Sequence, residues 1–365
     1  MISRIEIKNF KSIKELSLEL KPINIFIGAN GAGKSNFLGF FQLLKNIFRI
    51  NLKNYIATQA GADNILHFGT KNSDYLSGLV EFNKINRYSF TLKPDIESGM
   101  FFENEYNSLF CESTHSDNYP SWRNKKIDSG NTESSLEKVD PNWIKPLKEY
   151  ISSFDTFHFH DTSSTSKIKR ICDITENQAL NDDGSNLAAY LYAIQQFHPV
   201  EFKRIETLIH SVAPFFKSFD LKPDRFEPDH IRLEWRHQTY DDFYKANHLS
   251  DGTLRFIALT TLLLQPVTPN LIIIDEPELG LHPFAIAKIA GMIKSAASKG
   301  SQIFIATQST DLISHFQPED IITVDQKDGQ SIFKHLDTEQ LADWLGEYTI
   351  GELWKRNIIQ GGQPK

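Results

Sequence analysis

One segment near the N-terminus constrains the fold of this chain more than any other. Residues 28–35 read Gly-Ala-Asn-Gly-Ala-Gly-Lys-Ser, and they follow the continuous apolar run Ile23–Ile27. Such a run, ending in glycines, is typical of a buried parallel strand. From residue 35 to residue 48 the apolar residues recur at helical spacing. The segment therefore predicts a strand, a glycine-rich loop and a helix in that order, as in α/β proteins.

The residue types of this loop suit phosphate binding. Glycines let backbone N–H groups close around phosphate oxygens, and the N-terminus of the following helix adds positive dipole there. We expect Lys34 to reach the β- and γ-phosphates of a nucleotide and Ser35 to ligate Mg²⁺. A glycine turn that merely caps a helix is the alternative. The complete P-loop pattern in its strand–loop–helix context disfavours it.

The most hydrophobic strand expected in the chain ends in two carboxylates, Asp275 and Glu276. In P-loop enzymes an aspartate at the end of a strand holds the metal ion, and Asp275 is expected to take that role. Glu276 is then expected to orient or deprotonate the attacking water. Two solvated acids after a core strand are the alternative. The P-loop upstream and the following residues 277–282 (Pro-Glu-Leu-Gly-Leu-His) argue against it.

A third segment lies just before the helix expected at residues 254–264. Residues 249–253 read Leu-Ser-Asp-Gly-Thr. A small hydroxyl and a glycine at a helix start can form an anion site, although this short stretch alone fits an ordinary N-cap equally well. Its position between the P-loop and the acidic strand favours the anion site.

Composition limits the class of protein and its compartment. Lys and Arg total 39 against 46 Asp and Glu, so the net charge of -7 gives no overall attraction to nucleic acid or an anionic membrane. Cys111 and Cys172 lie far apart and in no paired motif, which disfavours a disulfide framework or zinc site and favours a reducing compartment. We see no secretory signal and no apolar run near the roughly 20 residues of a membrane helix. The sequence predicts a soluble, cytoplasmic protein without a membrane partner.

Hydrophobic patterns predict the remaining elements. Residues 111–141 are polar and are interpreted as a long, partly mobile loop. There is no internal repeat and no heptad run, which argues against a long coiled coil. Strands are expected at 5–10 and 16–20 (as a hairpin), within 77–102, and at 154–159, 218–221, 231–236, 271–275 and 302–306; helices are expected at 186–197, 199–212, 254–264 and 284–298.

Read in order, the motifs at 28–35, 249–253, 275–278 and 306–309 (Ala-Thr-Gln-Ser) resemble those of ABC-type ATPase heads. The chain is most similar to stand-alone bacterial AAA family ATPases related to RecF, the SMC heads and the ATPase half of OLD nucleases. The resemblance implies an α/β P-loop NTPase, a two-lobed ABC ATPase head with a short helical insert and no long coiled coil. It implies lobe I at 1–165 with the P-loop and a β-rich subdomain, a helical insert at 166–215, and lobe II at 216–365 with signature, Walker B, D-loop and sensor.

The resemblance also implies residue roles, in a Mg²⁺-dependent dimer whose two heads sandwich two ATP molecules. Ser250 and Gly252 would contact the γ-phosphate held by the other copy's P-loop, and residues 278–282 would cross the dimer axis. Gln308 stands where most ABC proteins have a γ-phosphate-sensing histidine. The nucleotide set implied is Lys11, Ser12, Asn30, Gly31, Ala32, Gly33, Lys34, Ser35, Asn36, Ser250 and Gly252; the metal set is Ser35 and Asp275; the catalytic set is Glu276, Gln308 and Lys34.

The sequence departs from the general ABC pattern in three places. Asp251 and Thr253 replace a glycine and a glutamine, which adds negative charge near a phosphate. Gln308 cannot take up a proton as histidine can, although its amide can still donate a hydrogen bond. The insert lacks coiled-coil arms, which puts DNA tethering by such arms in doubt. We therefore expect slow ATP hydrolysis.

Several stretches have more than one interpretation. His158 and His160 alternate on one strand face and could suit a metal; His160 or Asp161 could instead share in contacting Mg²⁺, and a structural role is favoured over both. His67-Phe68 could stack on adenine or belong to the core. Residues 181–186 are expected to form a turn and helix cap, with partner binding as the alternative. The basic stretches 123–126 and 167–170 are expected to be solvated, with nucleic-acid contact as the alternative.

The expected role is the ATPase component of a bacterial anti-phage defence or DNA-maintenance system, acting as an ATP-dependent homodimer or higher homo-oligomer. Because the chain ends soon after Trp354, we expect a separately encoded effector such as a nuclease. The alternatives are a RecF-like DNA-binding repair ATPase acting alone and a non-hydrolysing ATP-gated scaffold. A transporter ATPase is disfavoured, because its P-loop and signature lie much closer together than Lys34 and Ser250.

Overall fold

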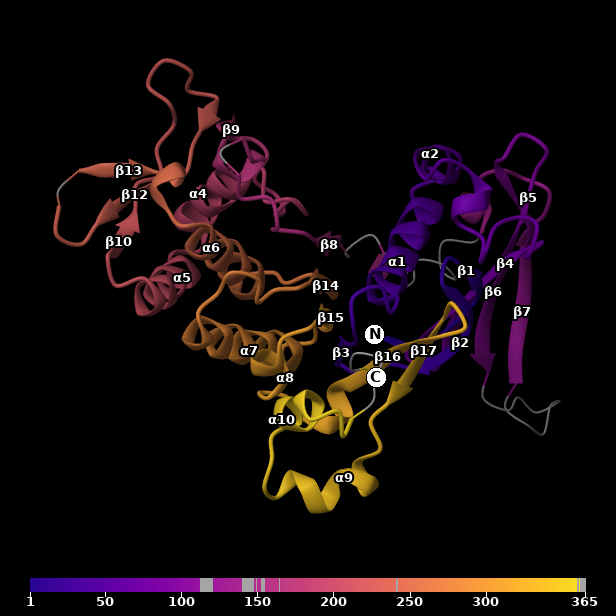
Figure 1. Ribbon diagram of the computed structural model, residues 1–365. Helices are drawn as coiled ribbons and strands as arrows, with labels where there is room; N and C mark the ends of the chain where they lie inside the picture. The colour runs from indigo at the N-terminus through magenta and orange to yellow at the C-terminus, as the bar shows by residue number, and fades with distance from the viewer. Residues whose placement is uncertain are drawn as a thin grey trace. The chain divides into compact units, whose positions relative to one another are not determined.

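The computed structural model describes residues 1–111, 121–139, 148, 150–151, 155–163, 165–240, 242–359 and 361. The chain forms two compact units (Figure 1). The first comprises Met1–Phe154, Gln302–Thr310 and Gln317–Lys365, and the second comprises Asp155–Ser301 and Asp311–Phe316. Both mix helices and strands, in keeping with the α/β class expected. The functional division at residues 165 and 215 remains a prediction.

An antiparallel sheet of six strands forms one layer of the first unit, in the order β2-β1-β4-β5-β6-β7. The expected hairpin of β1 and β2 is confirmed, as are strands within residues 77–102. The strand bounds are β1 Ile2–Phe10, β2 Ile13–Glu19, β4 Leu76–Phe82, β5 Asn86–Pro94, β6 Met100–Cys111 and β7 Ser121–Asp128.

The loop expected at residues 111–141 is wrong in part. Residues 121–128 form strand β7, and Leu136–Lys138 form the 3₁₀ helix η2, while 112–120 and 140–141 lie outside the described residues. Strand β7 lies at the edge of the sheet and pairs only with β6 among the described strands. Most of its side chains are exposed, so the apolar alternation by which a strand is recognised is missing.

Parallel pairing surrounds the strand that precedes the P-loop. Strand β3 (Ile23–Ile27) is buried at all five positions and pairs in parallel with β15 (Gln302–Thr307) and β16 (Ile321–Lys327). Strand β17 (Gln330–His335) pairs antiparallel with β16. The buried parallel strand expected here is confirmed. The helices whose bounds are described in this unit include α1 Lys34–Phe48, α2 Leu52–Thr58, α9 Thr338–Leu345 and α10 Ile350–Lys355, with 3₁₀ turns η1 Ala62–Asn64 and η5 Pro318–Asp320.

Phenylalanine rings fix α1 against this parallel sheet. The Phe37 ring of α1 lies 4.5 Å from the Phe26 ring of β3, centroid to centroid. The Phe41 ring lies 5.1 Å from that of Phe304 in β15, and all four side chains are fully buried. Because burying one such side chain is worth about 1.5–3 kcal/mol, the helix that opens at the P-loop is held firmly on its sheet.

The second unit contains the acidic strand and the signature helix. Strand β14 (Leu271–Asp275) pairs in parallel with the short β8 (Asp155–Phe157), which is shorter than the expected 154–159. The remaining elements are η3 Lys167–Lys169, β9 Cys172–Asp173, α4 Leu187–Phe197, α5 Pro199–Val212, β10 Phe216–Phe219, β11 His230–Ile231, β12 Glu234–His237, β13 Phe243–Lys245, η4 Ala246–His248, α6 Asp251–Leu264 and α7 Pro283–Ser298, with α8 Thr310–Ile313 starting at the boundary residue 310.

The four helices expected in this unit are confirmed, and one expected strand is not. Residues 231–236 form two short strands, because β11 pairs with β9 whereas β12 pairs with β10 and β13. Ile231, Leu233 and Trp235 are all buried, so the alternation that predicted one strand is real. Alternation reports burial and carries no information on the pairing partner, which changes between Ile231 and Glu234.

The lengths of the helices show whether any could form a long coiled coil or span a membrane. The longest helix in the described part of the chain, α7, has 16 residues. None of the described helices is long and apolar enough to cross a membrane.

Candidate functional site

Glycines of the P-loop are required by close backbone approach. A Cβ on Gly28 would lie 2.3 Å from the Val324 carbonyl oxygen of β16. Gly33 has a φ of 111°, and a Cβ there would lie 1.9 Å from Ser331 Oγ. Neither position accepts a side chain without displacing the neighbouring strands, so the loop conformation depends on these glycines.

The P-loop lysine lies over its own loop. Lys34, the first residue of α1, is only 6% exposed, and its Nζ donates to the carbonyl oxygens of Gly28 (2.7 Å) and Ala29 (3.1 Å). Ser35 follows in the first turn of the helix and is exposed. A positive charge, a hydroxyl and a helix N-terminus therefore gather at one loop, which is the chemistry that a phosphate and its cation require.

Ser12 belongs to the same hydrogen-bonded group. Asn36 Nδ2 donates to Ser12 Oγ over 2.7 Å, and Ser331 Oγ lies 2.7 Å from Ser12 Oγ. Ser331 Oγ also donates to the Ala32 carbonyl oxygen over 2.6 Å. The structure therefore brings Ser12, Asn36 and the P-loop together. Ser331 carries no local signal in the sequence, because it lies in an edge strand that is distant from the P-loop along the chain.

Gln308 follows β15 and contacts the P-loop directly. Its Nε2 donates to Asn30 Oδ1 over 2.6 Å. The residue expected to replace the phosphate-sensing histidine therefore lies at the loop expected to hold phosphate. An amide in this place can donate a hydrogen bond to a phosphate oxygen without a change of protonation.

A cavity of about 620 Å³ lies beside Ser12 in the first unit. Lys11, Ser12 and Phe68 contribute to its wall, and burial lowers the pKa of Lys11. His67 and Phe68 differ in environment: His67 is 4% exposed and contacts the Lys11 carbonyl oxygen through Nδ1 (2.6 Å), whereas Phe68 is 59% exposed. His67 thus belongs to the core, and of this pair only the Phe68 ring is exposed enough to stack on a base.

Asp275 and Glu276 lie where the acidic strand of the second unit ends. Glu276 has a φ of 44°, a left-handed conformation that is uncommon for a residue other than glycine. Its carbonyl oxygen accepts from the Leu279 N–H (3.2 Å), which closes a turn directly after the strand. Strained conformations of this kind cost of order 1–3 kcal/mol and cluster at functional sites. The strain supports the choice of Glu276 as a functional residue.

The signature segment begins helix α6, as expected. Ser250 is the N-cap, and its Oγ accepts from the Thr253 N–H over 3.2 Å. A Cβ on Gly252 would lie 2.3 Å from the Gly280 carbonyl oxygen. The first turn of α6 is therefore packed against the segment expected to cross a dimer axis. The capping geometry is observed, and the anion contact remains a prediction.

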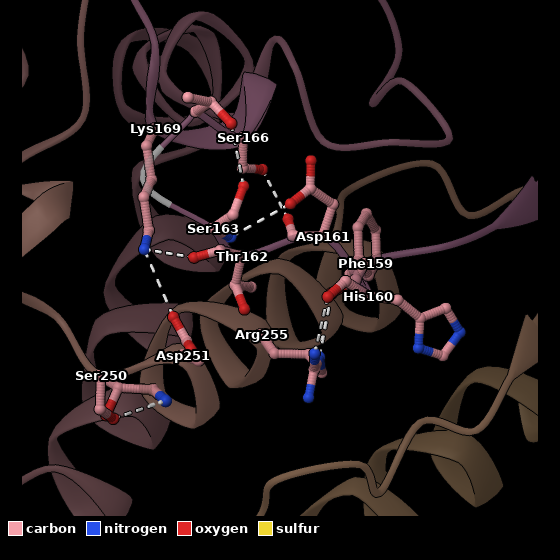
Figure 2. Close-up of polar contacts among 12 residues, drawn as sticks. Phe159, His160, Asp161, Thr162, Ser163, Ser166, Lys169, Ser250, Asp251 and Arg255 are labelled. Carbon is pink, nitrogen blue, oxygen red and sulfur yellow. Dashed lines mark hydrogen bonds and ion pairs between the residues drawn. The ribbon is translucent and has the colours of Figure 1, made fainter.

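The extra negative charge of Asp251 has a partner. Lys169 Nζ lies 3.3 Å from Asp251 Oδ1 and donates to the Thr162 carbonyl oxygen over 2.5 Å (Figure 2). Lys167 pairs with Asp183 over 3.0 Å. Two of the three basic side chains in residues 167–170 are thus engaged within the protein, which does not favour nucleic-acid contact there. The charge that Asp251 adds to the signature is partly offset.

Arg255 connects three segments of the second unit and was not among the residues predicted from the sequence. Its Nε donates to the Phe159 carbonyl oxygen (2.9 Å) and one terminal nitrogen to that of His160 (3.0 Å), as Figure 2 shows. The other terminal nitrogen donates to the Leu279 carbonyl oxygen. The side chain is 6% exposed, and burial lowers its pKa. The signal in the sequence that could have indicated a role for Arg255 is its position as a charged residue in a largely apolar helix.

His158, His160 and Asp275 come together, which the sequence did not foresee. Each offers one ligand atom, and these atoms lie within 4.8 Å of one another. Partial desolvation, the largest effect, lowers the pKa of His158, although this residue is exposed. Asp161 differs, because its carboxylate accepts from the Ser163 N–H (3.1 Å), and this turn lowers its pKa. Asp161 is occupied with its own turn, while the two histidines face the acidic strand's end.

These loops and strand ends define a P-loop ATPase of the ABC type. The chain belongs to the family described as "AAA domain, putative AbiEii toxin, Type IV TA system", whose model matches residues 23–314. It is 23% identical to the Old nuclease of Escherichia phage P2, over 94% of this chain and 62% of that protein. The chain thus spans less than two thirds of that relative. A shorter match, 31% identical, covers 22% of this chain and 28% of the Energy-coupling factor transporter ATP-binding protein EcfA of Methanocaldococcus jannaschii.

Solved structures confirm the fold class. An Smc head bound to the C-winged helix domain of ScpA superposes with a TM-score of 0.63 at 16% identity, covering 94% of this chain and 99% of that one. An Smc head with an extended coiled coil, in a complex derived from Pyrococcus furiosus, gives 0.57 at 15% identity, covering 95% and 98%. The expected fold of an ABC-type ATPase head is therefore confirmed, and the described residues contain no long helix.

Proposed function

We propose that this protein hydrolyses ATP with Mg²⁺, slowly, in a head-to-head dimer that closes when ATP binds and reopens after hydrolysis. The observation that carries the proposal is the P-loop of the first unit. Lys34 is held over the loop carbonyls, Ser35 is exposed at the helix N-terminus, and Gln308 contacts Asn30. Family membership supports nucleotide use, since the matched model covers the P-loop and the acidic strand alike.

The residues present fit Mg²⁺. This ion prefers oxygen ligands, and the Ser35 hydroxyl and Asp275 carboxylate supply them. Bound Mg²⁺ would neutralise charge on the phosphates during transfer. The Lys34 ammonium and the loop N–H groups would bind the β- and γ-phosphates, and the Gln308 amide would donate to the γ-phosphate. Glu276 would orient the attacking water or accept its proton.

Two further groups complete the proposed nucleotide site. Lys11, Ser12, Asn30 and Asn36 would line the nucleotide within the copy that binds it. Ser250 and Gly252 would reach the γ-phosphate in the partner copy, with residues 278–282 crossing the axis. The packing of Gly252 against Gly280 supports this, because the two segments expected to face a partner are joined within one unit.

Assembly with Mg-ATP tests the proposal. Glu276→Gln keeps Asp275 and should slow phosphate release about 10²-fold or more, so that a closed dimer accumulates in sedimentation. Ser250→Arg puts a bulky side chain into the shared interface, and the double variant should bind ATP yet stay monomeric. If the assembly state of the Glu276→Gln protein does not change with ATP, the dimer model is wrong. Unchanged phosphate release in Glu276→Gln defeats the assigned role of Glu276, and no phosphate release in the unmodified protein leaves the scaffold alternative.

We further propose a cytoplasmic role in anti-phage defence or DNA maintenance, with a separately encoded effector such as a nuclease. Support comes from the family description and from similarity to the phage P2 Old nuclease along most of the chain. Co-purification with the product of an adjacent nuclease-like gene, dependent on ATP, is the expected result. Salt-dependent, ATP-stimulated DNA binding by the protein alone would instead favour the RecF-like alternative.

A further inference from the structure

Parallel pairing brings the ends of two strands together in the second unit. Phe157 of β8 is the register partner of Ile274 of β14. The residue that follows Phe157 is His158, and the residue that follows Ile274 is Asp275, so both lie at the carboxyl end of these parallel strands. Because carboxyl ends of neighbouring parallel strands meet at one edge, proximity of these two side chains follows from the topology and needs no chance placement of loops.

The backbone that carries both histidines is fixed by hydrogen bonds. The His158 N–H donates to the Asp182 carbonyl oxygen over 2.9 Å. The carbonyl oxygens of Phe159 and His160 both accept from the Arg255 guanidinium (Figure 2). Phe159 itself is buried, which leaves the two imidazoles on either side of an anchored residue. The imidazole pair is therefore presented from a supported segment, as binding sites require.

The three side chains lie close to the separation that ligands of one metal ion require. One ligand atom from each of His158, His160 and Asp275 lies within 4.8 Å of the others, and the two imidazole centroids are 6.2 Å apart. Metal–nitrogen and metal–oxygen bonds of about 2.0–2.2 Å require ligand atoms at most about 4.4 Å apart. The ligand atoms are therefore at, or within about 0.4 Å of, that limit.

We propose that His158, His160 and Asp275 form a site for a divalent first-row transition ion, which binds before any nucleotide is present. Two imidazoles and one carboxylate suit such ions, whereas Mg²⁺ prefers oxygen ligands in an octahedral arrangement. Three protein ligands leave positions open for water or a phosphate oxygen. The inference goes beyond the proposed function: it concerns the ion that Asp275 holds without nucleotide, whereas Mg²⁺ is proposed to act together with bound ATP.

Titration with Co²⁺ tests the site without nucleotide. Tag-free protein should bind one Co²⁺ per chain, with visible absorption bands that report nitrogen and oxygen ligands, and excess Mg²⁺ should not displace it. His158→Ala and His160→Ala should each weaken Co²⁺ binding at least about tenfold, since even residues that only orient metal ligands contribute 10–100-fold. His315→Ala removes an exposed histidine of the same unit and is the matched control. Far-UV circular dichroism checks that each variant is folded.

Two outcomes overturn the inference. Absence of stoichiometric Co²⁺ binding is one, and equal Co²⁺ binding by His158→Ala, His160→Ala and the His315→Ala control is the other, because adventitious surface binding alone explains it. Lys34→Ala separates this inference from the proposed function. That variant should lose ATP binding and keep Co²⁺ binding, so failure of the metal site leaves the ATPase assignment standing, and retained ATP affinity would refute the ATPase assignment without touching the metal site.

Discussion

Arg255 is the most informative single residue to change in the second unit. Its guanidinium donates to three carbonyl oxygens that belong to two different loops. Arg255→Ala removes all three hydrogen bonds at once and leaves a cavity at the start of α6. Arg255→Lys keeps the charge, but an ammonium group cannot reproduce the planar fork that reaches Phe159, His160 and Leu279 together.

The expected loss follows from the hydrogen bonds. A hydrogen bond to a charged group contributes about 1.5–3 kcal/mol net, and the bonds to Phe159 and His160 have ordinary lengths of 2.9 and 3.0 Å. Arg255 is 6% exposed, so water reaches the orphaned carbonyl oxygens poorly. We expect Arg255→Ala to lower the free energy of unfolding by about 3–6 kcal/mol, and Arg255→Lys by roughly half of that.

Urea unfolding followed by circular dichroism measures the effect. Arg236→Ala is the matched control, because that side chain is 40% exposed and makes an ion pair with Asp220 over 3.0 Å. The Asp220 side chain is 12% exposed, and such a partly exposed pair is worth about 0–1 kcal/mol. If Arg255→Ala unfolds at the same urea concentration as Arg236→Ala, the guanidinium does not hold the loops together, and the reasoning fails.

Three further predictions concern the nucleotide site. Lys34→Ala should abolish tight ATP binding in calorimetry while the melting temperature stays near that of the unmodified protein; ordinary ATP affinity would contradict the P-loop assignment. Gly252→Ala places a Cβ 2.3 Å from the Gly280 carbonyl oxygen, so thermal unfolding should report a loss of about 1–3 kcal/mol, and an unchanged melting temperature would show that the contact yields freely. Phe68→Ala should weaken ATP binding by about 1–3 kcal/mol if the exposed ring stacks on adenine. Equal affinity for ATP in fluorescence titration would remove Phe68 from the site.

Local patterns predicted the elements in which burial is one-sided or complete. The apolar run at residues 23–27 predicted β3, and the helical spacing of apolar residues predicted α1. Both elements lie within one residue of the expected bounds. The P-loop was recognisable because its glycines, lysine and serine are adjacent in sequence. The structure adds the physical reason for Gly28, which lies against the backbone of β16, a strand far away along the chain.

Features that depend on partners distant in the chain could not be predicted from the sequence. Strand β7 has no buried face, so its sequence lacks the apolar alternation of a strand. The change of pairing partner between β11 and β12 has no local signal in the sequence. His158 and His160 were noticed, but their meeting with Asp275 follows from the pairing of β8 with β14, which periodicity does not specify. Ser331 and Arg255 act through hydrogen bonds to residues remote in sequence.

The position of β3 between β15 and β16 has a consequence for biosynthesis. Strands β15 and β16, which flank the P-loop strand, are translated late. So is Ser331, whose hydroxyl donates to the carbonyl oxygen of Ala32, 299 positions earlier in the chain. At about 5–20 residues per second, the apolar β3 waits roughly 15–60 s on the ribosome before its partners exist. During that time its hydrogen-bonding edges are open to other strands. A ribosome-associated chaperone that shields the nascent N-terminal segment should therefore raise the yield of folded protein.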